Sequence, residues 1–139
     1  MVGGTPRHMQ TFVLATNSET VSETLCSYLE TVLDPEDSVY AVNSQRGGDS
    51  TSSGAVADGK AALEIVSDRL GDQVSVETYQ IIRGNSPADD IFDIAGEVDA
   101  DELVIGVRKR SQTDRLIFGS VAQDIMRQSD YPMRVVPRE

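Results

Sequence analysis

The stretch LVIGVRKRSQTDRLIFGS, residues 103–120, contains the features that decide the fold. It begins with an apolar run, continues as a polar segment, and ends in Gly119-Ser120 ahead of an amphipathic segment. This order predicts a buried strand, a polar loop and the start of a helix. Since phosphates bind at such helix starts, the same stretch contains the first candidate binding site.

The charge of this stretch differs from that of the rest of the chain. Residues 106–120 hold four of the twelve basic residues and one of the twenty-three acidic residues, which gives the segment a charge of +3. Because the whole chain has a net charge of −11, the other 124 residues sum to −14. A positive segment in an acidic protein indicates an anionic ligand. The alternative is that Arg108, Lys109, Arg110 and Arg115 are solvated surface charges.

Outside this stretch, short apolar runs predict buried strands, and apolar residues spaced three and four apart predict amphipathic helices. Asn17 or Ser18 is the expected N-cap of the first helix, Ser86 caps the third, and Gly71 ends the second. The expected strands are residues 11–15, 38–42, 74–82, 102–105 and 132–136. The expected helices are residues 19–33, residues 55–70, a helix beginning at Pro87, and residues 119–129.

The alternation of strands and helices predicts the fold class. It is an α/β protein with an open, mostly parallel five-stranded sheet and helices on both faces. Residues 1–9 are Gly-rich and aperiodic, which predicts a flexible tail, and residues 10–139 form one domain.

In such a sheet, ligands bind beyond the carboxyl ends of the strands, where the winding reverses. We expect the loops after Ala15 and Ile105 to face each other across this crevice. The backbone N–H groups of Gly119, Ser120 and Val121 would then point at an anion. This arrangement suits a nucleotide.

Other residues have structural interpretations that we prefer. A lone His8 cannot form a multi-histidine metal site, and Cys26 lies on an apolar helix stripe, which favours a small buried side chain over a reactive thiol. Asp89 and Asp90 follow the helix start at Ser86, so the helix dipole explains both carboxylates. The alternative for this pair is a general acid/base or a metal site.

Composition excludes several functional classes. The acidic balance argues against a general nucleic-acid surface, and a single cysteine allows no intrachain disulfide. No apolar run resembles a signal peptide or approaches the roughly 18 residues of a membrane span, so we expect no membrane association and a cytoplasmic location. The acidic excess also suggests a cytoplasm of high salt, although many ordinary proteins are acidic.

The glycine spacing resembles the universal stress protein family, and the resemblance covers nearly all of residues 10–137. The family pattern is Gly, two residues, Gly, nine residues, Gly, then Ser or Thr. This chain has Gly106, Lys109 in the second glycine position, and Gly119-Ser120 at the required spacing. The SE pair at 18–19, GNSP at 84–87 and the final YPMRVV strengthen the resemblance.

The resemblance implies a sheet of order 3-2-1-4-5 and a homodimer, often through the last strand, here residues 132–136. It also implies an adenine nucleotide ligand (ATP, ADP or AMP), with or without Mg²⁺. In ATP-binding members an acid contacts the adenosine, and the aligned residue here is Thr16. Its Oγ1 can hydrogen-bond a ribose hydroxyl but supplies no carboxylate. The adenine would be held by backbone at the end of the second strand, which is Val42.

By the same resemblance, the phosphates would contact Gly106, Gly119, Ser120 and Val121. Arg108 and Lys109 lie beside them, and a positive φ at Lys109 would cost about 1 kcal/mol.

The expected role is regulatory, because no Ser/His/Asp, Cys/His or metal cluster that would indicate an enzyme is visible in the sequence. Slow ATP hydrolysis stays open. The alternative is a nucleotide-free dimeric module of the same fold that docks an unknown protein partner. Thr16 and Lys109 favour that alternative.

Overall fold

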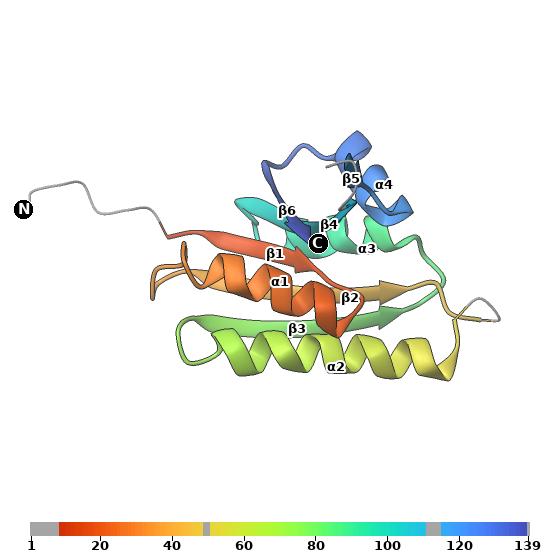
Figure 1. Ribbon diagram of the computed structural model, residues 1–139, viewed down its shortest axis with the longest axis horizontal. Helices are drawn as coiled ribbons and strands as arrows, with labels where there is room; N and C mark the ends of the chain where they lie inside the picture. The colour runs from red at the N-terminus through yellow and green to blue at the C-terminus, as the bar shows by residue number, and fades with distance from the viewer. Residues whose placement is uncertain (1–8, 49–50, 111–114, 139) are drawn as a thin grey trace, which may run out of the picture.

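The computed structural model describes residues 9–48, 51–110 and 115–138, so all of the predicted tail except Met9 lies outside the described residues. Figure 1 shows a twisted sheet with helices packed against both faces. The elements are β1 Thr11–Ala15, α1 Glu19–Leu29, β2 Ser38–Gln45, α2 Ser53–Leu70, β3 Ser75–Ile82, α3 Pro87–Glu97, β4 Glu102–Arg110, β5 Arg115–Ile117, α4 Ser120–Gln128 and β6 Met133–Arg138.

The long strands are parallel and lie in the order β3-β2-β1-β4-β6, which confirms the predicted order 3-2-1-4-5 and the α/β class. The short β5 was not predicted. It pairs antiparallel with the end of β4, where Arg108 has Ile117 on one edge and Arg138 on the other. Since β6 lies on the edge of β4 opposite β1, β5 lies on the same edge as β1, beyond the point where β1 ends.

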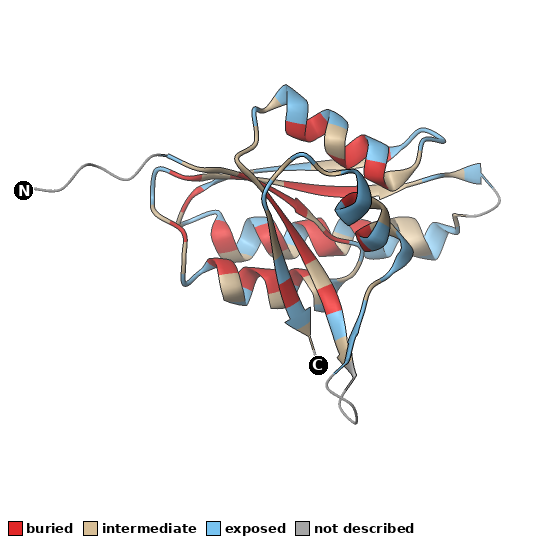
Figure 2. Ribbon diagram, turned by 90° about the horizontal axis from the view of Figure 1, so that it is seen from above, coloured by how far each residue is buried: buried red, intermediate tan, exposed pale blue. Residues whose placement is uncertain are grey.

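Two apolar clusters hold the layers together, one on each face of the sheet (Figure 2). Phe12 and Leu14 of β1 pack toward α1 and α2, whereas Val13 packs toward α3 and α4. Cys26 is fully buried in the first cluster, as predicted, and burial raises the pKa of its thiol to about 11. No helix within the three described ranges is long and apolar enough to cross a membrane.

Three of the four helices in the described ranges begin at a serine cap. The side chains of Ser18, Ser52 and Ser86 each accept a hydrogen bond from a backbone N–H in the first turn of α1, α2 and α3. The caps at Ser18 and Ser86 were predicted, whereas α2 begins earlier than expected. Helix α4 has Gly119 as its N-cap and no side chain that caps it. Its first N–H groups therefore have no side-chain acceptor.

Several element ends differ from the prediction. Helix α1 ends at Leu29, four residues early, because residues 30–32 form turns. β2 continues to Gln45 because β3 offers it ladder partners along its whole length. β4 continues to Arg110 because β5 and β6 pair with its end. The polar loop expected at 106–120 is therefore in large part a hairpin of β4 and β5.

Candidate functional site

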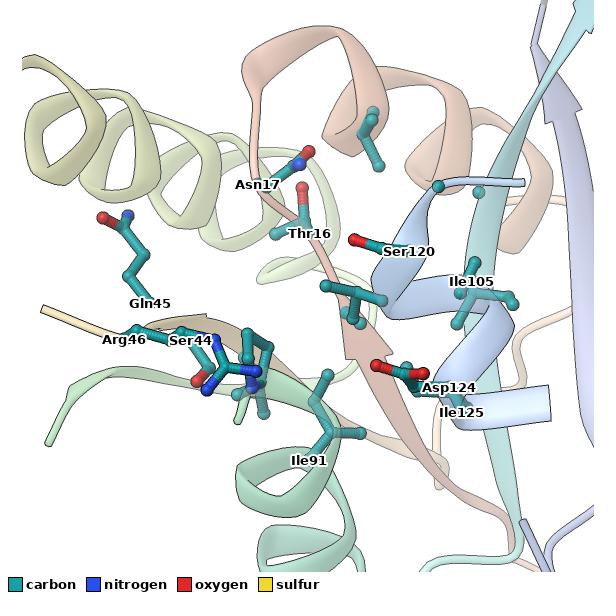
Figure 3. Close-up of a pocket in the computed structure, with 18 of the residues that line it drawn as sticks. Thr16, Asn17, Ser44, Gln45, Arg46, Ile91, Ile105, Ser120, Asp124 and Ile125 are labelled. Carbon is teal, nitrogen blue, oxygen red and sulfur yellow. The ribbon is translucent and has the colours of Figure 1, made fainter. Parts of the chain in front are cut away.

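A cavity of about 630 Å³ lies beyond the carboxyl ends of the strands, beside β1, where the winding reverses. Figure 3 shows Ser44, Gln45 and Arg46 on one side of it and Ser120 and Asp124 on the other. The predicted site residues that line it are Ala15, Thr16, Val42, Gly106, Gly119, Ser120 and Val121. The structure therefore brings together the two loops that were expected to face each other.

Arg108 and Lys109 are the predicted site residues that do not line this cavity. Both lie in the hairpin, where Arg108 is paired with Ile117 and Lys109 with Leu116. Lys109 does not adopt the positive φ that would be strained at a non-glycine residue: among the described non-glycine residues, only Asp99 has one. Lys109 is an extended strand residue, so the backbone strain that its replacement of glycine suggested does not arise.

Thr16 is 5% exposed, and its hydroxyl is bonded within the protein. Its Oγ1 lies 2.7 Å from Ser22 Oγ, and Ser22 Oγ in turn donates to the carbonyl of Ala62 at 2.7 Å. A hydroxyl has one hydrogen, so Ser22 has none left and Thr16 donates to it. The carbonyl of Ser18, 3.2 Å from Thr16 Oγ1, is a second acceptor for the same hydrogen. Toward a ligand, the oxygen of Thr16 can therefore only accept.

Val42 is not the end of β2, which corrects the strand end expected there. Its carbonyl accepts a hydrogen bond from the N–H of Thr16 at 3.0 Å, so this backbone group is used by the protein. Ser44, Gln45 and Arg46 follow at the true end of the strand and line the cavity. Sequence reasoning missed them because three polar residues after an apolar run look like a loop.

A buried amide network explains why the polar end of β2 stays in the sheet. The side chain of Asn43 donates to the carbonyl of Thr16 at 2.9 Å and accepts from the Nε2 groups of Gln45 and Gln80 at 2.9 and 3.1 Å. Those two Nε2 groups also donate to the carbonyls of Ala55 and Val56 in α2. The network therefore joins β1, β2 and β3 to the first turn of α2.

Gly59 makes room for this network. A Cβ at that position would lie 2.1 Å from Asn43 Oδ1 and 2.8 Å from Gln80 Nε2, which is far inside van der Waals contact. The helix can approach the amides closely only because residue 59 has no side chain.

Asp90 is in the first turn of α3, as predicted, but it is fully buried, which the sequence did not indicate. Its Oδ2 accepts from Ser44 Oγ at 2.6 Å and its Oδ1 from Asn85 Nδ2 at 3.3 Å. The α3 dipole favours negative charge at this place. Asp90 therefore joins α3 to the end of β2 beneath the cavity.

The opposite wall is the start of α4. Gly119 is exposed, with φ −66° and ψ 165°, and a Cβ there would meet nothing within 4 Å. The uncapped N–H groups and the positive end of the helix dipole are the features that suit an anion at this wall.

The charged residues that line the cavity are Arg46, Asp58 and Asp124. Among the described side chains of the positive segment, Arg108, Lys109 and Arg115 do not line the cavity, so the anion donors of its described lining are Arg46 and backbone N–H groups. Across the described part of the chain, no group of three or more His, Cys, Asp or Glu side chains could hold a metal ion.

Comparisons with known proteins agree with this geometry. The model of the universal stress protein family matches residues 10–137. The structure of a universal stress protein from Archaeoglobus fulgidus is 32% identical, with a TM-score of 0.72 over 94% of this chain and 99% of that one. Another from the same organism, in complex with dAMP, is 27% identical, with a TM-score of 0.66 over 93% of this chain and 98% of that one.

More distant relatives share the fold or part of the sequence. A universal stress protein family protein from Arabidopsis thaliana with AMP bound is 17% identical, with a TM-score of 0.65 over 94% of this chain and 92% of that one. The stress response protein NhaX of Bacillus subtilis is 34% identical over 67 residues, which are 48% of this chain and 40% of that protein. The matched region thus spans less than half of that curated relative.

Proposed function

This chain belongs to the universal stress protein family, and we propose that its cavity binds an adenine nucleotide in a regulatory stress response. The observation that carries the proposal is the uncapped start of α4, which opens onto a cavity of about 630 Å³ at the reversal of the sheet. The dAMP and AMP complexes of the two relatives support it. The proposed role is binding rather than catalysis.

Each part of a nucleotide has a matching part of the cavity. Phosphate oxygens accept from the N–H groups of Ser120 and Val121, and the open space beside Gly119 lets them approach. Gly106 also lines the cavity, and its missing side chain lets α1 pack closely, since a Cβ there would lie 3.3 Å from Val21. Thr16 Oγ1 accepts from a ribose hydroxyl. The apolar surface at Val42, Pro87 and Ile91 suits the face of a base.

ATP, ADP and AMP differ in the charge that they bring into this cavity. Mg²⁺ binds proteins through one or two carboxylates and substrate phosphates and keeps several waters. Asp58 and Asp124 are the carboxylates that line the cavity, so an ATP-bound Mg²⁺ fits its charge better than bare ATP.

Calorimetric titration of ATP, with and without Mg²⁺, tests the proposal in molar KCl. The wild type is expected to bind, and Gly119→Val is expected to bind at least about tenfold more weakly, because its side chain occupies the phosphate position. The variant is expected to fold, since φ is negative and the site is open. No heat from the wild type, or equal affinity in the variant, refutes the proposed site.

We also propose that this chain forms a homodimer in which β6 pairs with a second copy. The last strand, which was expected at residues 132–136, is β6 Met133–Arg138. The carbonyl of Pro132 accepts from the N–H of Leu103. The backbone N–H and C=O groups of even-numbered residues in this strand therefore face β4, and those of odd-numbered residues face the open edge of the sheet. Pro137 has no N–H, which limits outward pairing to the region around Val135, whose side chain is 37% exposed.

Sedimentation of Val135→Lys tests the homodimer, with Leu116→Lys on β5 as a control that also places a lysine at an exposed apolar position. We expect the first variant to be monomeric and the second to remain dimeric. Dimers of both variants would contradict pairing at β6.

The second candidate function is a nucleotide-free module that docks a protein partner. It is favoured by Thr16, which offers neither a carboxylate nor a hydroxyl hydrogen to a ligand. The ATP titration separates the two candidates. The cytoplasmic location and the high-salt setting remain predictions from composition, and a melting temperature that rises from low salt to molar KCl would support the latter.

A further inference from the structure

Ser44 stands at the carboxyl end of β2 and lines the cavity on the side of α3 (Figure 3). It follows Val42 on the same face of the strand, next to the apolar surface where we place the base. Neither the family resemblance nor the sequence patterns had pointed to this residue. Its hydrogen bonding determines what kind of group it can bind.

The hydroxyl hydrogen of Ser44 is used by Asp90. The two oxygens lie 2.6 Å apart, the short distance of a hydrogen bond to a charged acceptor. A carboxylate can only accept, so the hydrogen must come from Ser44. Asp90 is 0% exposed, so water cannot replace Ser44 as its partner. Toward the cavity, Ser44 Oγ therefore offers lone pairs and no hydrogen.

The other oxygen of Asp90 also has a donor, which holds the carboxylate in this orientation. Asn85 Nδ2 bonds Oδ1 at 3.3 Å, and the N–H of Asp90 itself bonds to the carbonyl of Ser86 inside the helix. Turning the carboxylate to release Ser44 would leave a buried charged acceptor without a partner, which is costly.

The polar neighbours of Ser44 on this wall also bond their side-chain hydrogens within the protein. Thr16 donates its hydrogen to Ser22, and Gln45 commits its Nε2 group to Asn43 and Ala55. The other side-chain donors on the lining near β1 and β2 are Asn17, Arg46 and Thr51. Asn17 and Arg46 are exposed, and Thr51 is half-buried in the segment after β2, where its Oγ1 accepts from the N–H of Gly47 at 2.9 Å. Within the described chain, the side chains of Thr16, Ser44 and Gln45 therefore offer this part of the cavity acceptors, because their hydrogens are bonded within the protein.

We propose that Ser44, held by Asp90, makes the cavity select a base with an exocyclic amino group over one with a carbonyl oxygen at the same place. This inference rests on the proposed nucleotide binding. An amino group donates to the lone pairs of Ser44, whereas a carbonyl oxygen would face another acceptor above a buried carboxylate. Sites built to bond a polar group reject the analogue that lacks it.

AMP and IMP test this directly, because IMP carries a carbonyl oxygen at position 6 in place of the amino group of AMP. Calorimetry on the full chain in molar KCl is expected to show AMP binding at least about tenfold more tightly than IMP. In Ser44→Ala the two affinities should agree within about threefold, mainly through weaker AMP binding. Ser38→Ala, at the other end of β2, should keep the wild-type ratio.

Asp90→Asn is the second variant. Its amide can donate to Ser44 Oγ and leave the serine hydrogen for the ligand, so the preference for AMP should fall by at least about fivefold. Thermal melting checks that this buried substitution folds. If it does not, Ser44→Ala decides.

Three results would overturn the inference. One is equal affinity of the wild type for AMP and IMP. Another is a Ser44→Ala variant whose ratio of AMP affinity to IMP affinity equals that of the wild type. The third is loss of selectivity in Arg46→Gln, which would assign base reading to the exposed guanidinium. Failure of the wild type to bind any adenine nucleotide is a different result: it refutes the proposed function, and the selectivity with it.

Discussion

The wall formed by β1 and β2 uses its buried side-chain donors within the protein, whereas the start of α4 leaves backbone donors available to a ligand. Thr16, Asn43, Ser44 and Gln45 give their hydrogens to protein acceptors. Gly119 caps α4 without any side-chain hydrogen bond. A nucleotide has amino and hydroxyl donors at one end and phosphate acceptors at the other, so this difference fixes which way it would lie.

The two walls also differ in rigidity. The first is held by hydrogen bonds that join its strands to α1, α2 and α3, and Thr16, Asn43 and Asp90 within it are buried. The second consists of an exposed glycine and the first turn of a short helix. Disrupting the first wall should therefore cost stability, while changes to the second should alter affinity and leave the fold intact.

Gly59→Ala is expected to have the largest effect, because it damages the support of the first wall. A methyl group 2.1 Å from Asn43 Oδ1 must displace the amide network, and overpacking together with lost buried hydrogen bonds should cost about 3 kcal/mol. Denaturant unfolding measures this. Gly54→Ala in the same helix is the control and should stabilise by about 0.5–1 kcal/mol, since its Cβ finds only an ordinary contact at 3.7 Å. Similar stabilities for the two variants would show that the network does not restrict residue 59.

Ser120→Asp should separate affinity from stability at the second wall. A carboxylate in the first turn of α4 interacts well with the helix dipole and should stabilise the protein by about 0.3–1 kcal/mol. It would also repel a phosphate, so nucleotide affinity should fall by more than about tenfold. Ser53→Asp at the start of α2 should give the same stabilisation with unchanged affinity in molar KCl. Wild-type affinity in Ser120→Asp would place the anion elsewhere.

Thr16→Val tests the acceptor role of the first wall at its ribose end. The neutral hydrogen bonds lost with Thr16 Oγ1 should lower stability by about 1 kcal/mol and AMP affinity by about fivefold. Unfolding and calorimetry on the same sample measure both. An unchanged affinity would mean that the ribose does not contact this hydroxyl.

Lys109→Gln should have the smallest effect on binding. Lys109 lies in the hairpin and does not line the cavity, so ATP affinity in molar KCl, where the Debye length is about 3 Å, should change by less than about twofold. At low salt a larger change is expected from unscreened charge. A tenfold loss of ATP affinity in molar KCl would show that the hairpin contacts the phosphates. It would contradict the view that backbone donors, and not side chains, bind them.

The sequence predicted the parts of the fold that depend on local patterns. The parallel strands follow from the alternation of strand and helix patterns, and the caps at Ser18 and Ser86 follow from the residue types at the helix starts. The meeting of the loops after Ala15 and Ile105 follows from general rules for open α/β sheets, whereas the strand order 3-2-1-4-5 was implied by the family resemblance. The caps and the types of the elements need only the identities of nearby residues. The α/β class and the position of the crevice could therefore be predicted from the sequence.

The missed features depend on contacts between distant residues. Ser44 and Gln45 look like loop residues, and only their bonds to Asp90 and Ala55 keep them in the sheet. A first-turn aspartate has the same sequence signal whether it is solvated or buried, so the burial of Asp90 could not be read from its neighbours. β5 was missed because a basic, polar segment carries no strand pattern until β4 pairs with it.

The N–H groups at the start of α4 also bear on how this chain can change over time. A backbone donor is present whatever side chain a position carries, so most substitutions cannot delete it. The surface of a protein with net charge −11 can then adapt to its ionic surroundings without altering the groups proposed to hold the phosphate. Selection could therefore change the surface side chains in response to salt while the backbone N–H groups that would bind the ligand stay the same.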